Sequence, residues 1–364
     1  MRCWTRGSGV VEASAAAHGS SVTEIADPER GRRVRSLMEG LVRSSAGVAL
    51  LVVQLNVLYD STPWLQVVVS LLGFYLLVTG LSSLVRGMFG ARVEPASWLS
   101  VAWLTVLLVF VCLQLAGLFD DLTADFANRE QPPEFSTHEP LGTDRVGKSV
   151  MNQAIQGARV SLIVGIGSVG IGLAVGTVVG LVAGYFRGPA EGTFNILTDS
   201  ILAFPALILL FTIVAIFGGS VLVVTLALSM LSIPTMGRLA RANTLTFAAR
   251  EFVTAARAMG ASNSRILFRE ILPNVALPLA SYAVIIVAVV IVAEASLSFL
   301  GVGIDPISTP TWGNMISEGR QQSVLTEAPH IVFVPGVLMF LTVLSLNRVG
   351  ESLRALWDPR ESKL

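Results

Sequence analysis

Residues 160–184 read VSLIVGIGSVGIGLAVGTVVGLVAG and contain no charged side chain. A helix needs about 20 mostly apolar residues to cross a bilayer, so this stretch predicts a transmembrane helix. Four of its glycines, Gly172, Gly176, Gly180 and Gly184, recur every four residues and therefore share one helix face. Because glycine has no side chain, a second helix can approach that face closely. The stretch therefore predicts a tightly packed bundle of membrane helices.

The composition of the whole chain agrees with a membrane protein. Of the 364 residues, 53% are hydrophobic and only 14% are charged, against about 25% charged in a typical soluble domain. The mean hydropathy is +0.70. A disordered chain would be poor in apolar residues, and a nucleic-acid binder is usually basic, whereas this chain has a net charge of zero. We therefore expect an all-α integral membrane protein that binds no nucleic acid.

Eight stretches are candidate membrane spans: 46–59, 64–85, 97–118, 160–184, 195–218, 220–236, 276–300 and 330–347. An even number of spans places both termini on one side, and 20 of the 25 basic residues then fall on that side. Basic loops favour the cytoplasm, so we expect cytoplasmic N- and C-termini in the plasma membrane. The short first span leaves a re-entrant hairpin over 46–85 as the alternative.

The longest inner loop between spans covers residues 237–275. Gly260 follows an alanine-rich segment and is placed to end a helix in the left-handed conformation. Ser262 is then suited to cap a second short helix, and Pro273 favours a break before the next span. The pattern predicts helix, turn and helix in the cytoplasm. Four apolar side chains would remain exposed for a partner: Phe252, Met259, Ile266 and Leu267.

This segment resembles the signature loop of ABC importer permeases, which reads Glu-Ala-Ala, three residues, Gly, nine residues, Ile, any residue, Leu-Pro. Thr254 replaces the glutamate and Glu270 replaces the isoleucine of that pattern. The resemblance implies that the loop docks on an ATP-hydrolysing subunit and transmits its motion. The residues it implicates are Thr254, Ala255, Ala256, Arg257, Met259, Gly260, Leu272 and Pro273.

Further segments resemble the oligopeptide/dipeptide subfamily, in the order in which that subfamily has them: His138–Asp144, Gly157–Leu162, Asp199 with Ala203–Pro205, Glu294–Gly301, Thr311–Met315 and Trp357–Arg360. The chain is thereby similar to the C-type permease subunit of peptide importers over about three-fifths of its length. The resemblance implies a six-span core in residues 97–364. The cytoplasmic segment 1–44 and the extra spans in 45–96 would precede that core.

The same resemblance implies the partners and the mode of action. The chain would pair with a homologous permease subunit, two ATP-binding subunits would dock from the cytoplasm, and an extracytoplasmic solute-binding protein would deliver peptides or similar small solutes. Transport would proceed by alternating access within the lipid bilayer, with ATP hydrolysis on the partner subunits. A self-sufficient secondary transporter is the alternative. It predicts more charge pairs within the membrane and an internal repeat.

One motif argues for a different function. Gly142–Ser149 satisfies the P-loop pattern G-x-x-x-x-G-K-S, which would indicate a membrane-bound nucleotide hydrolase. The proline-rich residues 132–140 before it cannot form the buried strand that a P-loop requires, and the predicted topology places the motif outside the cell. We therefore expect Thr143 or Asp144 to cap an amphipathic helix along the outer membrane surface that leads into the span at 160–184.

Two carboxyl groups fall inside predicted spans, where ionisable groups are costly and often functional. Asp199 lies about one turn from the inner end of its predicted span, where the helix dipole favours a structural role. Glu294 lies deeper and should face the bundle or a water-filled cavity, paired with a donor. Both are candidates for the translocation path or gate. The sequence shows no catalytic constellation and no cofactor motif. Two cysteines and three histidines give no basis for a metal site.

Overall fold

The computed structural model describes residues 95–115, 122–134, 139–306 and 309–357, together with a few positions between 38 and 79. The chain divides into two compact units, Met1–Ser61 with Leu65–Val93 and Thr62–Trp64 with Glu94–Leu364. In the first unit, residues 38–39, 41–46 and 49–50 are helical. The predicted spans 46–59 and 64–85 otherwise lie almost wholly outside the described residues.

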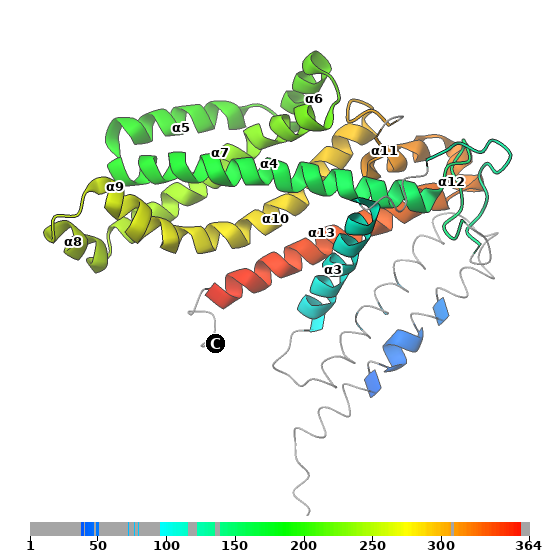
Figure 1. Ribbon diagram of the computed structural model, residues 1–364, viewed down its shortest axis with the longest axis horizontal. Helices are drawn as coiled ribbons and strands as arrows, with labels where there is room; N and C mark the ends of the chain where they lie inside the picture. The colour runs from blue at the N-terminus through cyan, green and yellow to red at the C-terminus, as the bar shows by residue number, and fades with distance from the viewer. Residues whose placement is uncertain are drawn as a thin grey trace, which may run out of the picture. The chain divides into compact units, whose positions relative to one another are not determined.

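The described part of the second unit is built from helices (Figure 1). Five of them are long and apolar enough to cross a membrane. They are α3 (Pro95–Leu115), α4 (Val150–Phe186), α7 (Val221–Ala248), the element Asn263–Phe299 and α13 (His330–Trp357). The element Asn263–Phe299 consists of α9 (Asn263–Arg265), a π-helical turn (Ile266–Ile271) and α10 (Leu272–Phe299). The bent pair α5 (Gly188–Ala203) and α6 (Ala206–Phe217) brings the number to six if it counts as one span. The remaining short helices are α8 (Glu251–Ala258), α11 (Trp312–Ser317) and α12 (Gln322–Glu327).

The predicted span 195–218 is not one straight helix, because α5 and α6 meet at an angle of 83°. The break falls at Phe204 and Pro205, where Phe204 has extended backbone angles and Pro205 caps α6. Proline has no N–H to continue a helix, and it disfavours the helical conformation in the residue before it. The sequence Ala203-Phe204-Pro205 thus makes a corner where a continuous span was expected.

Pro234 does not interrupt its helix, in contrast to Pro205. α7 continues through Pro234 to Ala248 and therefore extends past the predicted end of the span at residue 236. The glycine face of α4 packs on α7 at both sides of this proline. A Cβ on Gly176 would lie 2.6 Å from the Ile233 carbonyl oxygen, and one on Gly184 would lie 2.9 Å from the Arg241 carbonyl oxygen. These distances allow no side chain, so the predicted close helix packing is confirmed.

The start of α4 also differs from the expectation. Its N-cap is Ser149, whose hydroxyl accepts a hydrogen bond from the Asn152 N–H, while Thr143 and Asp144 belong to the preceding loop. The helix has 37 residues and is about 55 Å long, well beyond the roughly 30 Å hydrocarbon core. It therefore extends past the bilayer as one rod, because no residue between 150 and 186 breaks it.

A small second core surrounds the N-terminal end of α4, where it meets α11, α12 and the start of α13. The Trp312 Nε1–H donates to the Ala154 carbonyl at 3.0 Å, and Gly157 lies against the same indole ring. The buried apolar side chains of this core are Val150, Ala154, Met315, Val324, Ala328 and Ile331.

Candidate functional site

The loop at residues 237–275 has the helix–turn–helix form that the sequence predicts. α8 ends in a Schellman turn, in which the Ala261 N–H donates to the Ala256 carbonyl and the Gly260 N–H donates to the Arg257 carbonyl, both at 3.0 Å. Gly260 has a φ of +80°, the left-handed conformation that this turn requires. Ser262 then caps α9, since its hydroxyl accepts from the Arg265 N–H at 3.4 Å.

The second arm of the loop joins the next span without the expected break at Pro273. A π-helical turn, Ile266–Ile271, comes directly before α10, and the Leu272 N–H donates to the carbonyl of Leu267, five residues back. Pro273 lies in the first turn of α10, where its missing N–H leaves no bond unmade. The widened turn and the position of the proline together keep the helix continuous.

The apolar residues of the loop divide into an anchor and an exposed surface. Ile266 and Leu267, which were expected to await a partner, are 0% and 3% exposed and belong to the main hydrophobic core. Met259 is 82% exposed at the tip of the turn. Phe252 and Phe268 are also exposed. These three residues are therefore the large apolar side chains that the loop exposes.

The structure places the other implicated residues around this surface. Ala256 is a buried residue of α8, and Leu272 is half-buried. The remaining implicated residues are exposed to solvent: Thr254, Ala255, Arg257, Gly260 and Pro273.

Sequence reasoning missed Tyr185, which connects the loop to the C-terminal end of α4. Its hydroxyl donates to Asn263 Oδ1 at 2.9 Å and accepts from Arg257 Nη2 at 3.3 Å. The Arg257 guanidinium also lies 6.0 Å from the centre of the tyrosine ring, within the range of a cation–π contact. Asn263 and Arg257 lie on opposite sides of Gly260, so one hydroxyl joins both arms of the turn. In the sequence, Tyr185 could have been recognised as an aromatic residue at the end of an apolar span.

Glu294 is completely buried within the bundle. Its carboxyl oxygens accept hydrogen bonds from Ser161 of α4 at 3.1 Å and from Ser298 of its own helix at 2.9 Å. The expectation that Glu294 faces the bundle and meets a donor is confirmed. Both donors are serine hydroxyls.

Asp199 has a different environment from the one expected. α5 begins at Gly188, so Asp199 lies in its C-terminal half, and Glu191 is the acidic residue of its first turn. The helix-dipole argument for Asp199 is therefore wrong. Asp199 instead forms an ion pair with Arg238 of α7 at 2.5 Å, and Glu191 pairs with Arg241 of the same helix. The Asp199 and Arg238 side chains are 67% and 48% exposed.

The P-loop-like segment folds around its own aspartate. Asp144 Oδ1 accepts the N–H groups of Val146 at 2.9 Å and Lys148 at 2.8 Å, and Oδ2 accepts from Gln153 at 2.7 Å. The loop amides that would have to cradle a phosphate are thus occupied. Burial raises the pKa of the neighbouring Glu318 to about 7, and the Asp144 carboxylate contributes to the rise.

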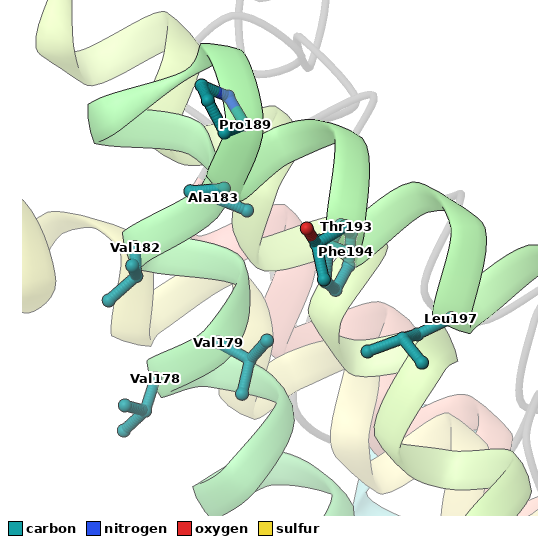
Figure 2. A pocket seen from close by; sticks show the side chains of 9 residues that line it. Val178, Val179, Val182, Ala183, Pro189, Thr193, Phe194 and Leu197 are labelled. Atoms are coloured by element: carbon teal, nitrogen blue, oxygen red, sulfur yellow. The ribbon is translucent and has the colours of Figure 1, made fainter.

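A groove of about 450 Å³ lies between α4 and α5 (Figure 2). It is almost entirely apolar, so it offers few groups that could orient a polar solute. Its lining consists of Val178, Val179, Val182, Ala183, Pro189, Ala190, Thr193, Phe194 and Leu197.

Helices that are long and apolar enough to cross a membrane define the chain as a multi-pass membrane protein. Residues 176–363 match the model of the family described as binding-protein-dependent transport system inner membrane component. This match covers α7, the whole loop, α10 and α13, and the chain belongs to that family. It is thus the permease component of an ABC importer.

Curated relatives carry the same description of a permease. The chain is 39% identical over 220 residues to the glutathione transport system permease protein GsiD of Pectobacterium atrosepticum, covering 60% of this chain and 72% of the relative. It is 36% identical over 236 residues to GsiD of Escherichia coli O157:H7, covering 65% and 76%. Among solved structures, the MetNI methionine ABC transporter in inward-facing conformations matches at 21% identity with a TM-score of 0.47, covering 57% of this chain and 97% of that chain.

Proposed function

We propose that this chain is one half of the membrane channel of a small-peptide importer and that it pairs with a homologous permease subunit. The observation that carries the proposal is the family match over residues 176–363, which includes the helix–turn–helix loop with its exposed apolar tip. The relatives named as glutathione transport permeases favour a short peptide or a peptide-like solute as the substrate.

The loop is the proposed docking element for the ATP-binding subunits. Met259, Phe252 and Phe268 present apolar surface next to the exposed Arg257. Buried aromatic, Met and Arg side chains are typical of the centre of protein interfaces. Ile266 and Leu267 pack in the core and hold the loop to it. A partner that binds the exposed side chains would therefore displace the loop as a unit.

The exposed face of α7 supports a water-accessible path on the cytoplasmic side. Its outer half exposes the large apolar side chains of Leu222, Leu226 and Met230, whereas its inner half exposes Arg238, Ala242 and Thr246. Arg238 lies about 26 Å along the helix from Val221, within a bilayer core of roughly 30 Å. An ion pair that faced lipid there would be costly. We therefore assign Asp199 and Arg238 to the translocation path between the two permease subunits.

Glu294 is the proposed fixed point of the outer gate. It lies close to the end of α10 and holds α4 through Ser161. A buried polar group of this kind loses its partner if the helices separate, so it favours two discrete arrangements over gradual sliding. Closure on the outer side would keep the Ser161–Glu294 bond, and opening would break it.

Purification of the full complex from its native membrane tests the assembly. Two ATP-binding subunits and a second permease should co-purify, and the isolated chain should not hydrolyse ATP. ATP turnover by the isolated chain would overturn the proposal. In proteoliposomes supplied with the binding protein, ATP-driven uptake of labelled glutathione and labelled dialanine then identifies the substrate. Uptake of neither peptide would contradict the proposed substrate class and leave the assembly intact.

The proposed orientation places both termini in the cytoplasm. Cys3 lies near the N-terminus, so it reports the side on which that end of the chain lies. In a Cys112→Ser variant, which removes the exposed second cysteine, a membrane-impermeant maleimide should label Cys3 in permeabilised cells and leave it unlabelled in intact ones. Labelling of Cys3 in intact cells would show that the N-terminus lies outside and would contradict the proposed orientation.

A further inference from the structure

We propose that Tyr185 is the positioning residue that connects the cytoplasmic loop to α4, so that α4 carries the displacement of the loop to the outer face. This inference rests on the proposed docking of ATP-binding subunits on the loop. Beyond the proposed function, the inference assigns a role to a residue outside the signature motif. It also states that the displacement of the loop is transmitted along α4. The supporting observations are the contacts of the Tyr185 hydroxyl and the continuity of α4 from that residue outward.

The hydroxyl contacts hold the two arms of the loop at one point. Arg257 belongs to α8 and Asn263 begins α9, and the Tyr185 hydroxyl bonds to both. The Schellman turn at Gly260 fixes the geometry between those arms. A force applied to α8 or to the exposed Met259 therefore reaches Tyr185 through two hydrogen bonds and the cation–π contact with Arg257.

α4 is suited to transmit that force because it is one rigid element. It runs unbroken from Val150 to Phe186, and its glycine face leaves no gap against α7. Gly184, the last of those glycines, directly precedes Tyr185. Packed protein interiors transmit displacement, since small shifts cannot be absorbed by compression.

The outer end of α4 is tied to the extracytoplasmic loops. Trp312 of α11 bonds to the Ala154 carbonyl at 3.0 Å, and Gln153 bonds to Asp144 at 2.7 Å. These contacts lie about 45 Å along the helix from Tyr185. A shift of α4 would therefore move the surface formed by residues 142–149 and α11.

The loop is also connected to α10 through the chain itself, because Asn263–Phe299 forms one continuous helical element. The chain passes from α9 into α10 through the π-helical turn Ile266–Ile271, and such turns are local irregularities in an otherwise α-helical ladder. Apolar anchors at Ile266 and Leu267 hold this segment in place. Apolar contacts have no preferred direction, whereas the Tyr185 hydrogen bonds define one geometry.

The test uses the complete transporter in lipid nanodiscs, with a reporter at the outer end of α4. Cys3 and Cys112 are replaced by serine, and Val146→Cys supplies an exposed thiol in the outer loop. The labelling rate of this thiol by a maleimide is measured without nucleotide and after trapping with ATP and vanadate. Co-purification of the ATP-binding subunits is measured on the same preparations.

Four variants are compared on this background. Tyr185→Phe removes the hydroxyl and keeps the ring. Tyr282→Phe makes the same chemical change at a half-buried position of α10 and is the matched control. Asn263→Ala removes the acceptor, whereas Asn263→Asp retains one for the tyrosine hydroxyl.

We expect trapping to change the labelling rate in the reference protein and in Tyr282→Phe and Asn263→Asp. In Tyr185→Phe and Asn263→Ala the change should shrink about five-fold, as expected for the loss of a hydrogen bond, while the ATP-binding subunits still co-purify. A full response in Tyr185→Phe would overturn the inference, as would the absence of any response in the reference protein. Loss of co-purification from the reference protein would instead contradict the proposed function.

Discussion

The hydroxyl of Ser161 on α4 donates a hydrogen bond to the carboxyl group of Glu294 on α10 at 3.1 Å, and both residues are completely buried. The two residues are 133 positions apart in the sequence. The bond joins two spans in the interior of the bundle, where water cannot replace a lost partner. A buried polar group costs free energy unless it is hydrogen-bonded, so this pair specifies how the two helices align.

Ser161→Ala should lower the free energy of unfolding by about 1–3 kcal/mol, because one oxygen of Glu294 loses its partner while remaining buried. The matched control is Ser296→Ala in α10, whose hydroxyl donates to the Val292 carbonyl of the same helix. The unfolding temperature of the purified complex in detergent is measured for both variants. Equal midpoints for the two variants would show that the interhelical bond contributes nothing.

Gly180→Ala should disrupt the packing of α4 on α7, because a Cβ at this position would overlap the Gly237 carbonyl oxygen. Overpacking of this kind typically costs about 1–3 kcal/mol. Gly170 lies on the same helix, and a Cβ added there would meet nothing within 4 Å, so Gly170→Ala should be neutral or slightly stabilising. The yield of folded complex and its unfolding temperature distinguish the two. A stable Gly180→Ala protein would contradict the close approach of the helices.

The sequence was sufficient to predict features that depend on neighbouring residues. Apolar length predicted the five long apolar helices of the described core, the four-residue glycine period predicted the helix contact, and Gly260 with Ser262 predicted the turn. Each of these signals lies within a few residues of the structure that it specifies. Local backbone preferences and helix periodicity therefore account for most of the fold in the described core.

The features that were missed depend on residues distant in the sequence. Arg238 lies 39 residues from Asp199, and Asn263 lies 78 residues from Tyr185. The periodicity of residues along the sequence does not indicate which distant residues form such pairs. The two prolines show the same limit, because α7 continues through Pro234 against the glycine face of α4, whereas the chain bends sharply at Pro205. Proline is a local signal, but its outcome depends on the tertiary packing around it.

Gly260→Val should reduce ATP-driven transport while leaving membrane insertion intact. Gly260 adopts a φ of +80° with open space around it, so the substitution causes backbone strain without a steric clash. A left-handed conformation costs most residues about 1–2 kcal/mol, which would favour rearrangement of the turn. Gly260→Asn is the control, since asparagine tolerates this conformation. Uptake and ATP turnover in proteoliposomes measure the effect, and normal uptake by Gly260→Val would contradict it.

The outer loops should lose stability as the pH rises. Burial raises the pKa of Glu318 from 4.5 to about 7, the Asp144 carboxylate contributes to the rise, and Arg145 and Lys148 oppose it. The folded state therefore favours the neutral acid. Its contribution to stability is complete below about pH 4.5 and is lost as the pH rises to about 7.

The unfolding temperature of the complex at pH 5 and pH 8 measures this dependence. Glu318→Gln, which stays neutral, should flatten the difference, whereas Glu327→Gln at the exposed end of α12 should leave it unchanged. An unaltered pH profile in Glu318→Gln would assign the dependence to other groups.

Lys148→Ala should leave ATP turnover and transport by the complex intact, although Lys148 occupies the lysine position of a P-loop pattern. The N–H of Lys148 is bonded to Asp144, and substitution of the side chain keeps that backbone contact. Asp144→Ala should instead destabilise the outer loop, because the N–H groups of Val146 and Lys148 and the Gln153 amide would each lose an acceptor. Each lost bond to a charged acceptor costs about 1.5–3 kcal/mol. Unfolding temperature and ATP turnover separate the two variants. A folded Lys148→Ala complex without ATP turnover would restore the nucleotide-binding interpretation of this loop.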